Sequence, residues 1–402
     1  MSAINLDHNA AGAVDKDVLA EMLPFFTEKY GNTQSTVYEA GQIAYDAVEK
    51  ARAEVASLLG AAPDEILFTS SGTESNNLAL KGICADRAKR IGAKRIVISS
   101  IEHHSIAHAA RRLKEDGYEV VALGVDSDGL VNPDDLRQAL EAGQTSIVSI
   151  QHSNAEIGTI QNTAALSAVA REFDVPFHTD AVASVGQLPL DVNELGVQAM
   201  SVSSASISGP KGVGALFLRK GTRARPIMDG GVQERGLRPG TENVPGIVGM
   251  GRAASLAASR IEGRAAALRV MRDALIEGIR DRVGHARLTG HRTLRLPGHV
   301  SHCFDFIEGE GTLLYLAMKG IAASSGSTCS SKALKASHVL TSIGIPAEQA
   351  QGSIVMSLGD DNTQEQIDTT LDALEEVVGK LREMSPLYAN WRKENQECTA
   401  QL

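Results

Sequence analysis

Residues 200–220 read MSVSSASISGPKGVGALFLRK, and this stretch decides the fold. It predicts a short apolar strand, a loop rich in serine, glycine and proline, and a second apolar strand at 215–218. A loop of this kind at the mouth of an α/β sheet is a usual place for a phosphate-bearing ligand. The stretch therefore indicates an α/β fold with a candidate ligand site beside it.

Strand-like runs recur at regular intervals on both sides of this stretch. They lie at 65–69, 95–99, 119–123, 146–150, 175–180, 199–203 and 215–218. Helical spacing occurs between most of them, at 104–116 and 164–173, and before them at 15–28 and 39–59. Strands that alternate with helices predict a mainly parallel, seven-stranded sheet covered on both faces.

The regular alternation of strands and helices ends at about residue 255, and after it we expect a second, smaller α+β domain. Helical patterns at 265–283 and 364–384 enclose shorter strands near 298–306. We place the large domain at 13–255 and assign 1–12 together with 256–402 to the small domain. The polar tail from about Asn390 is expected to be loose.

Composition excludes several classes of protein. The 402 residues carry a formal net charge of −10, which argues against non-specific binding of nucleic acid. No apolar run approaches the length of a membrane span, and we expect no signal peptide because the first ten residues lack a basic flank and an apolar core. The four cysteines are widely separated with no CxxC spacing, so we expect a cytoplasmic protein with free thiols and no zinc site.

Two short motifs at predicted strand ends could bind an anionic aromatic ligand. The run Ser70–Asn77, SSGTESNN, opens a helix, whose N-terminal N–H groups can hold a phosphate; a plain helix cap is the alternative. Asp180 ends the strand at 175–180, where a carboxylate can pair with a protonated ring nitrogen or can serve as an ordinary turn residue.

A second chemical centre surrounds Cys329. The loop at 322–331 reads AASSGSTCSS, and its small polar residues leave a thiol unshielded and free to travel. The alternative is one more buried cysteine, which is the usual state of a free thiol.

Together these motifs resemble the NifS/IscS-type cysteine desulfurases, which have the fold-type I pyridoxal-phosphate transferase fold. The Gly-Pro-Lys-Gly-Val-Gly run at 209–214, the Gly-Thr-Glu at 72–74, the cysteine loop, the Ser-His-Val-Leu at 337–340 and the stretch at 230–243 all match. The resemblance implies a homodimer that binds pyridoxal phosphate and passes sulfur to an acceptor or iron–sulfur scaffold protein. The implied roles are phosphate binding by Thr73 and Ser203, phosphate binding in the neighbouring subunit by Thr241, pairing with the pyridine nitrogen by Asp180, ring stacking by His103, and persulfide formation by Cys329.

The chain departs from the family at five positions that surround the expected cofactor. Ser206 stands where the family has the lysine that holds the cofactor as a Schiff base, and Lys211 belongs to the structural Gly-Pro-Lys-Gly instead. The other four changes replace, in order, a phosphate-side histidine, an asparagine and a glutamine near the pyridoxal hydroxyl, and an arginine that holds the substrate carboxylate: Ala205, Ala155, Ala183 and Val355.

These losses leave three functional interpretations open. In the first, the protein serves sulfur mobilisation or iron–sulfur cluster assembly with weak or no cofactor-dependent turnover, because serine cannot form an imine, and Cys329 is persulfide acceptor or cluster ligand. In the second, it is an active desulfurase, converting L-cysteine to L-alanine with pyridoxal phosphate held non-covalently and His103 handling protons. In the third, it is a non-catalytic pseudoenzyme that binds the partners of a desulfurase.

Overall fold

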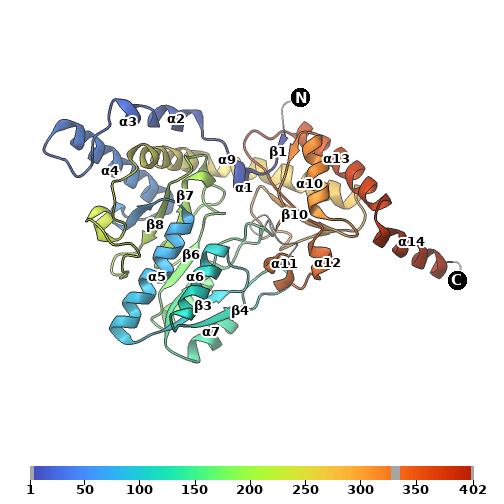
Figure 1. Cartoon of the computed structure of the whole chain (residues 1–402), viewed down its shortest axis with the longest axis horizontal. Helices are drawn as coiled ribbons and strands as arrows, with labels where there is room; N and C mark the ends of the chain where they lie inside the picture. Colours follow the sequence, from blue (N-terminus) through green and yellow to red (C-terminus); the bar gives the residue numbers. More distant parts are fainter. Residues whose placement is uncertain (1–3, 327–335, 400–402) are drawn as a thin grey trace.

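A seven-stranded sheet forms the centre of the computed structural model, which describes residues 4–326 and 336–399 (Figure 1). Strand β8 runs antiparallel to both of its neighbours, whereas the other pairings are parallel. This arrangement confirms the predicted mainly parallel sheet, and each strand lies within two residues of its expected bounds. In spatial order the strands are β2 (Ile66–Thr69), β8 (Gly214–Leu218), β7 (Ala199–Ser203), β6 (Phe177–Asp180), β5 (Thr145–Ser149), β3 (Arg95–Ser99) and β4 (Glu119–Leu123).

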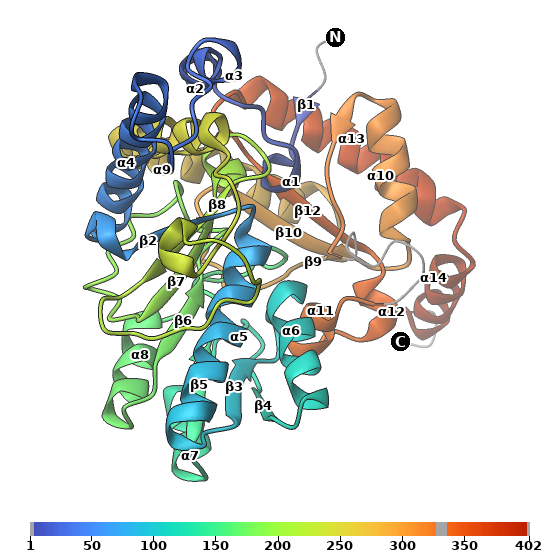
Figure 2. The same cartoon turned by 60° about the vertical axis from the view of Figure 1, so that its left-hand side comes forward.

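Helices cover both faces of this sheet because successive strand side chains point to opposite sides. In β2, for example, Leu67 packs in the cluster beneath one set of helices, while Ile66 and Phe68 pack in the other. The first set, in front of the sheet in Figure 2, is α5 (Gly72–Ile91) and α6 (His104–Glu115). The second set is α4 (Glu39–Leu59), α7 (Pro133–Glu141), α8 (Thr163–Glu172), α2 (Lys16–Met22), α3 (Pro24–Thr27) and the first part of α9 (Val244–Arg282).

Two of the expected helices have different bounds in the structure. The helix predicted over 15–28 is divided between α2 and α3, because Pro24 has no N–H to donate and begins a new helix. The helix predicted over 265–283 is the second half of α9, which runs unbroken from residue 244.

A second hydrophobic cluster joins the two ends of the chain. Strand β1 (Ile4–Asn5) pairs with β11 (Ile321–Ala322), and Leu6 packs with residues of α9 and α13. The division into domains at 12/13 and 255/256 remains a prediction, since α9 crosses it without a break. The other elements here are β9 (Ala286–Leu288), β10 (His299–Phe304), β12 (Ser353–Ser357), α10 (Gly309–Met318), α11 (His338–Ser342), α12 (Ala347–Ala350) and α13 (Gln364–Glu383).

The expectation of a loose tail from Asn390 is wrong for the described part of that segment. Residues Pro386–Thr399 form helix α14, which projects beside α13 in Figure 1. The Trp391 ring lies 4.5 Å from that of His285 and 5.5 Å from that of Phe306, measured between centroids. Aromatic packing of this kind gives a polar helix an apolar anchor, which the charge pattern of the tail does not reveal.

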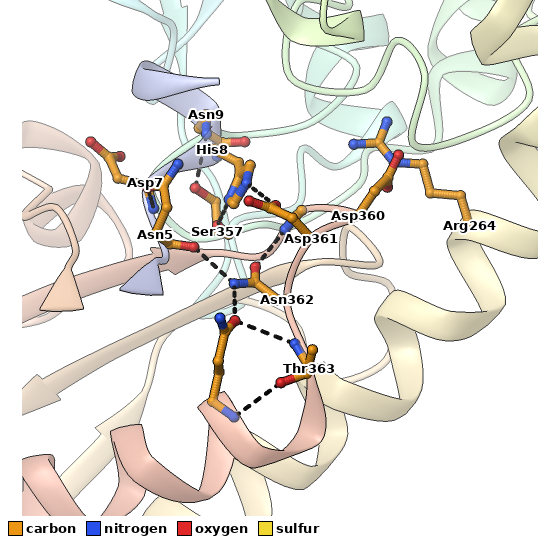
Figure 3. Close-up of polar contacts among 12 residues, drawn as sticks. Asn5, Asp7, His8, Asn9, Arg264, Ser357, Asp360, Asp361, Asn362 and Thr363 are labelled. Atoms are coloured by element: carbon orange, nitrogen blue, oxygen red, sulfur yellow. Dashed lines mark hydrogen bonds and ion pairs between the residues drawn. The ribbon is translucent and has the colours of Figure 1, made fainter. Parts of the chain in front are cut away.

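The N-terminal segment is tied to the loop that follows β12 (Figure 3). The His8 ring contacts the Asp361 carboxylate at 2.7 Å and the Ser357 carbonyl at 3.1 Å, and the Asn362 amide donates to the Asn5 carbonyl at 3.0 Å. The short helix α1 (His8–Ala11) begins here. These bonds place residues 5–9 beside β12, the strand that carries Val355.

No helix among the described residues combines the length and the apolar character that crossing a membrane requires. Even α9, which is 39 residues long, carries arginine and acidic residues along its length.

Candidate functional site

Three of the motifs meet at the carboxyl edge of the sheet. Gly72 begins α5 directly after β2, Val182 follows Asp180 at the end of β6, and Ser203 ends β7. A Cβ atom added to Gly72 would lie 2.4 Å from a Val182 methyl carbon and 3.8 Å from the Ser203 Cβ. Only glycine allows this approach, so the three loops share one site although more than 100 residues separate the first from the last.

The start of α5 has the geometry of a phosphate site. Ser71 caps the helix by accepting a hydrogen bond from the Glu74 N–H at 3.2 Å, and the Thr73 side chain is exposed beside it. The N-terminal N–H groups of this 20-residue helix carry its positive dipole end. Arg238 pairs with Glu74 at 3.0 Å, which holds the loop that carries the exposed Thr241 near the same helix start.

Asp180 is the buried acidic group of the site, and a chain of hydrogen bonds links it to His103. The Asn76 amide donates one N–H to the Asp180 carboxylate at 2.6 Å and the other to the Ser105 hydroxyl at 2.8 Å. That hydroxyl lies 2.7 Å from His103 Nδ1. Burial raises the pKa of Asp180, and the charge of His103 opposes that rise. The ring of His103 is exposed at the end of this chain.

Two of the five altered positions lie on η2 (Ser204–Ile207), the single turn that follows β7. Ala205 and Ser206 are both half-buried there, so the place of the expected lysine and histidine holds a methyl group and a hydroxyl group. The Ser204 hydroxyl beside them is buried without a hydrogen-bond partner among the described residues. The ammonium group of Lys211 donates to the Gly12 carbonyl at 3.1 Å.

The other three altered positions come from separate elements. Ala155 follows β5, with its side chain exposed and its carbonyl 2.9 Å from the His299 ring. Ala183 is half-buried three residues after Asp180, and its carbonyl accepts from Gln187 at 3.3 Å. Val355 is buried in β12, where its N–H donates to the Ser324 carbonyl at 2.7 Å. None of the three side chains can bind an anion or a phenolic oxygen.

Cys329, as persulfide acceptor or metal ligand, lies outside the described residues, but the chain on both sides of it is placed. On one side Ser324 bridges to Val355, and a Cβ added to Gly326 would lie 2.8 Å from the Glu156 carboxylate. On the other side the Ser337 hydroxyl donates to that same carboxylate at 2.5 Å. Both stems of the Cys329 segment therefore contact Glu156, the residue next to Ala155.

Two buried carboxyl groups, Glu102 and Glu156, were not singled out from the sequence. Burial raises the pKa of Glu102 to about 8, although the Ser99 hydroxyl and the Gln151 N–H both donate to it. Burial likewise raises the pKa of Glu156 to about 7, opposed by the Ser337 hydrogen bond. Glu102 is next to His103 in the sequence, and Glu156 is next to Ala155. Their positions beside candidate site residues were the sequence signal that could have identified them.

Asn76 was also missed as a site residue. It lies one helical turn after Gly72, on the same face of α5, and spacing of four residues was the signal that could have identified it. Its carbonyl oxygen is buried with no hydrogen-bond partner among the described residues. A donor group that bound beside this oxygen would be stabilised by it.

Histidines gather between α6 and α11, close to the stem of the Cys329 segment. The ring of His104 lies 5.0 Å from that of His108 and 5.1 Å from that of His338, and His338 also contacts the Glu102 carbonyl at 3.0 Å. Burial, followed by the charges of the neighbouring histidines, lowers the pKa of His104. In the part of the chain that the structure describes, no group of three or more histidine, cysteine, aspartate or glutamate residues is arranged to hold a metal ion.

Comparison with known proteins gives one consistent result. The family model for aminotransferase class-V matches residues 4–370. A cysteine desulfurase IscS of Methanosarcina thermophila is 47% identical over 385 residues, covering 96% of this chain and 94% of the relative. That of Dictyoglomus turgidum is 44% identical over 389 residues, covering 97% and 98%. Among solved structures, a NifS-like protein has a TM-score of 0.87 at 36% identity, covering 94% of this chain and 100% of that one.

Proposed function

The chain belongs to the class-V aminotransferases of the NifS/IscS cysteine desulfurase type, and from this premise we propose that it carries sulfur on Cys329 with little or no cofactor-dependent turnover of its own. One observation carries the proposal. Both stems of the Cys329 segment contact Glu156, which is next to Ala155, and Ser324 of one stem bridges to Val355, so this segment meets two of the positions where the family resemblance implies polar side chains.

The residues of the site fit pyridoxal phosphate at its phosphate group and at its ring nitrogen, but they do not fit it at its aldehyde group. The start of α5 would hold the phosphate through Thr73 and the helix N–H groups. The Asp180 carboxylate, which accepts hydrogen bonds from the Asn76 amide and the Val182 N–H, would pair with the protonated ring nitrogen. Ser206 offers no amine at the aldehyde end. When bound, the cofactor supplies an electron sink, but here it lacks a covalent anchor.

In this proposal the sulfur-transfer step uses the Cys329 thiol alone. A thiolate at Cys329 attacks the outer sulfur of a donor persulfide, so one S–S bond breaks as another forms and the donor leaves as a thiolate. No oxidant or reductant is required. An acceptor protein or iron–sulfur scaffold then takes the outer sulfur by the same exchange. Service of Cys329 as a ligand of an iron–sulfur cluster remains the alternative use of the same thiol.

A persulfide-labelling experiment tests this proposal. The protein is incubated with glutathione persulfide, and the mass gained is assigned to peptides. We expect the gain of one sulfur atom on the Cys329 peptide and none in Cys329→Ser. Cys303→Ser is the matched control, because Cys303 is buried and burial raises the pKa of its thiol to about 12. Equal labelling of Cys329→Ser and the wild type would contradict the proposal.

A second candidate, an active desulfurase with non-covalent cofactor, is favoured by the intact chain from Asp180 to His103. It predicts a visible absorption band when pyridoxal phosphate is added, and alanine production from L-cysteine. Asp180→Asn should abolish both, because the amide cannot balance a protonated pyridine nitrogen. Absence of alanine from the wild type would remove this candidate. If, in addition, Cys329→Ser retains full function in its native pathway, the remaining interpretation is a non-catalytic protein that binds the partners of a desulfurase.

We further propose a cytoplasmic homodimer, supported by an exposed apolar surface beyond the sheet. Val37 is 98% exposed and Val232 is 77% exposed, and Phe26 and Tyr38 are also exposed. The hydrogen bond from Thr33 to Glu242 at 2.7 Å holds the loop of Val37 and Tyr38 to the 230–243 stretch. Exposed apolar side chains of this size are typical of a protein interface. Val37→Asp should shift the mass measured by sedimentation from dimer to monomer; an unchanged mass would count against this surface.

A further inference from the structure

A cavity lined by four arginines lies at the edge of the sheet opposite the site described above. Its volume is about 290 Å³, and Pro176, before β6, and Gln198, before β7, lie in its wall. The arginines come from both layers of helices and from a loop: Arg87 and Arg90 on α5, Arg171 on α8, and Arg223 after β8. Figure 2 shows that α5 and α8 both run down to this edge.

The charge of the cavity is unlike that of the chain. The net charge of the whole protein is −10, yet Asp174 is the one carboxylate among the residues that line the cavity. Arg90 is paired with Asp86 at 2.6 Å, outside the lining. Among the described residues, no carboxylate comes within ion-pairing distance of Arg87, Arg171 or Arg223. The cavity therefore concentrates positive charge on an acidic protein.

Helix stability does not account for this arrangement. Arg90 and Arg171 lie in the last turns of their helices, where a cation also interacts favourably with the helix dipole. Arg87 lies one turn earlier, and Arg223 is on no helix. The Nε of Arg87 is buried without a hydrogen-bond partner among the described residues, and its Nη2 reaches only the Thr145 carbonyl, at 3.4 Å. The half-buried guanidinium group of Arg87 therefore has donors left to bind an acceptor in the cavity.

A second cavity lined by arginines has more carboxylates in its wall. It lies between α9 and residues 292–295 and measures about 490 Å³. There Arg272 pairs with Asp273 at 2.8 Å, and Arg292 pairs with Glu277 at 2.5 Å. Arg269 and Arg295, which also line it, have no carboxylate partner among the described residues, so two carboxylates accompany its four arginines, against one at the first cavity.

We propose that the cavity at Arg87, Arg171 and Arg223 binds a small molecule that carries phosphate groups. Guanidinium groups bind phosphate through paired N–H donors, and several of them around one cavity suit an anion with more than one negative charge. A volume near 300 Å³ is at the lower limit of small-molecule sites. Ile83 and Val175 add an apolar wall, which suits a phosphate ester as well as a free diphosphate.

The cavity is separate from the sulfur site. Helix α5 carries Gly72 at its first residue and Arg90 near its last, so about 30 Å of helix separates the two. The inference does not rest on the proposed function, and its test involves neither sulfur nor pyridoxal phosphate.

Calorimetric titration with inorganic pyrophosphate at low ionic strength tests the site. We expect saturable binding of one molecule per chain, and a loss of affinity of about tenfold or more in the double variant Arg171→Met/Arg223→Met. Both side chains are exposed, so the variant should fold. Arg280→Met, which removes an exposed charge from α9, is the matched control and should change the affinity by less than about twofold.

Three results would overturn the proposal. They are no saturable binding of pyrophosphate, equal affinity of the double variant and the wild type, and binding of citrate as tight as that of pyrophosphate. The last would indicate a site for anions in general rather than for phosphate groups. Thermal unfolding of each variant, without ligand, confirms that a loss of binding is not a loss of folding.

Discussion

Replacing Glu156 with glutamine should stabilise the protein at alkaline pH. The Glu156 carboxyl accepts a hydrogen bond from the Ser337 hydroxyl at 2.5 Å. Burial raises the pKa of Glu156 from the ordinary 4.5 to about 7. Glutamine retains an oxygen that can accept the same hydrogen bond, but it carries no charge at any pH. The substitution therefore removes the burial of a charge and leaves the contact with the stem of the Cys329 segment.

The magnitude and the sign follow from the raised pKa. The folded state holds this proton more tightly than the unfolded state, so the stability of the wild type falls as the pH rises from about 4.5 through about 7. Each pKa unit is equivalent to about 1.4 kcal/mol, so the loss at pH 8 is about 3 kcal/mol. With an unfolding entropy of about 2.1 cal/mol/K per residue over 402 residues, Glu156→Gln should raise Tm by about 4 °C at pH 8.

Thermal unfolding followed by circular dichroism at pH 5 and pH 8 measures this effect. The variant and the wild type should have nearly the same Tm at pH 5 and should separate at pH 8. Glu172→Gln is the matched control, since that carboxyl is exposed and its pKa is lowered by the hydrogen bond from Arg137. A variant no more stable than the wild type at pH 8, or equally more stable at both pH values, would refute the reasoning.

Three further predictions concern separate parts of the molecule. Arg52→Met should destabilise the protein by about 3–5 kcal/mol in urea unfolding, because buried Glu234 loses its cation. Arg52 donates two hydrogen bonds to the Glu234 carboxylate, at 2.8 and 2.9 Å. An unchanged unfolding midpoint would count against this prediction. Ser206→Lys should retain pyridoxal phosphate through dialysis, seen as a visible absorption band, and loss of the band at the wild-type rate would contradict the assignment of this position. Phe306→Ala should shift the emission of Trp391, the single tryptophan, to longer wavelength, because α14 loses an aromatic contact 5.5 Å away; unchanged emission would mean that α14 is held otherwise.

The local pattern of the chain was sufficient to predict the central sheet. β3 and β7 have the bounds predicted from their apolar runs, because buried strands are short, continuous and separated by clear turn residues. β4, a half-exposed strand at the edge of the sheet, also has its predicted bounds. The helix over 39–59 was likewise predicted to the residue, since Gly60 ends it in the left-handed conformation at φ 64°. One error was local, the division of the helix over 15–28 at Pro24. Another arose where distant contacts decide the outcome, at α14, whose anchor is an aromatic cluster from elsewhere in the chain.

The candidate site divides in the same way. Asn76, Glu102 and Glu156 were missed, whereas the other candidate residues, with Ser206 at the place of the expected amine, could be read from the sequence because chemistry depends on residue type and motif order. Their convergence could not: Asn76, Ser105 and Asp180 are joined by hydrogen bonds between segments that are remote in the chain.

The raised pKa of Glu156 and the charge of the arginine cavity are also products of tertiary structure alone. Burial and the distance between charges set both, and a linear sequence contains neither quantity. By itself, then, the sequence determined the sheet, the family and the residues available for chemistry. Only the folding of the chain decided which of those residues meet and which are removed from water.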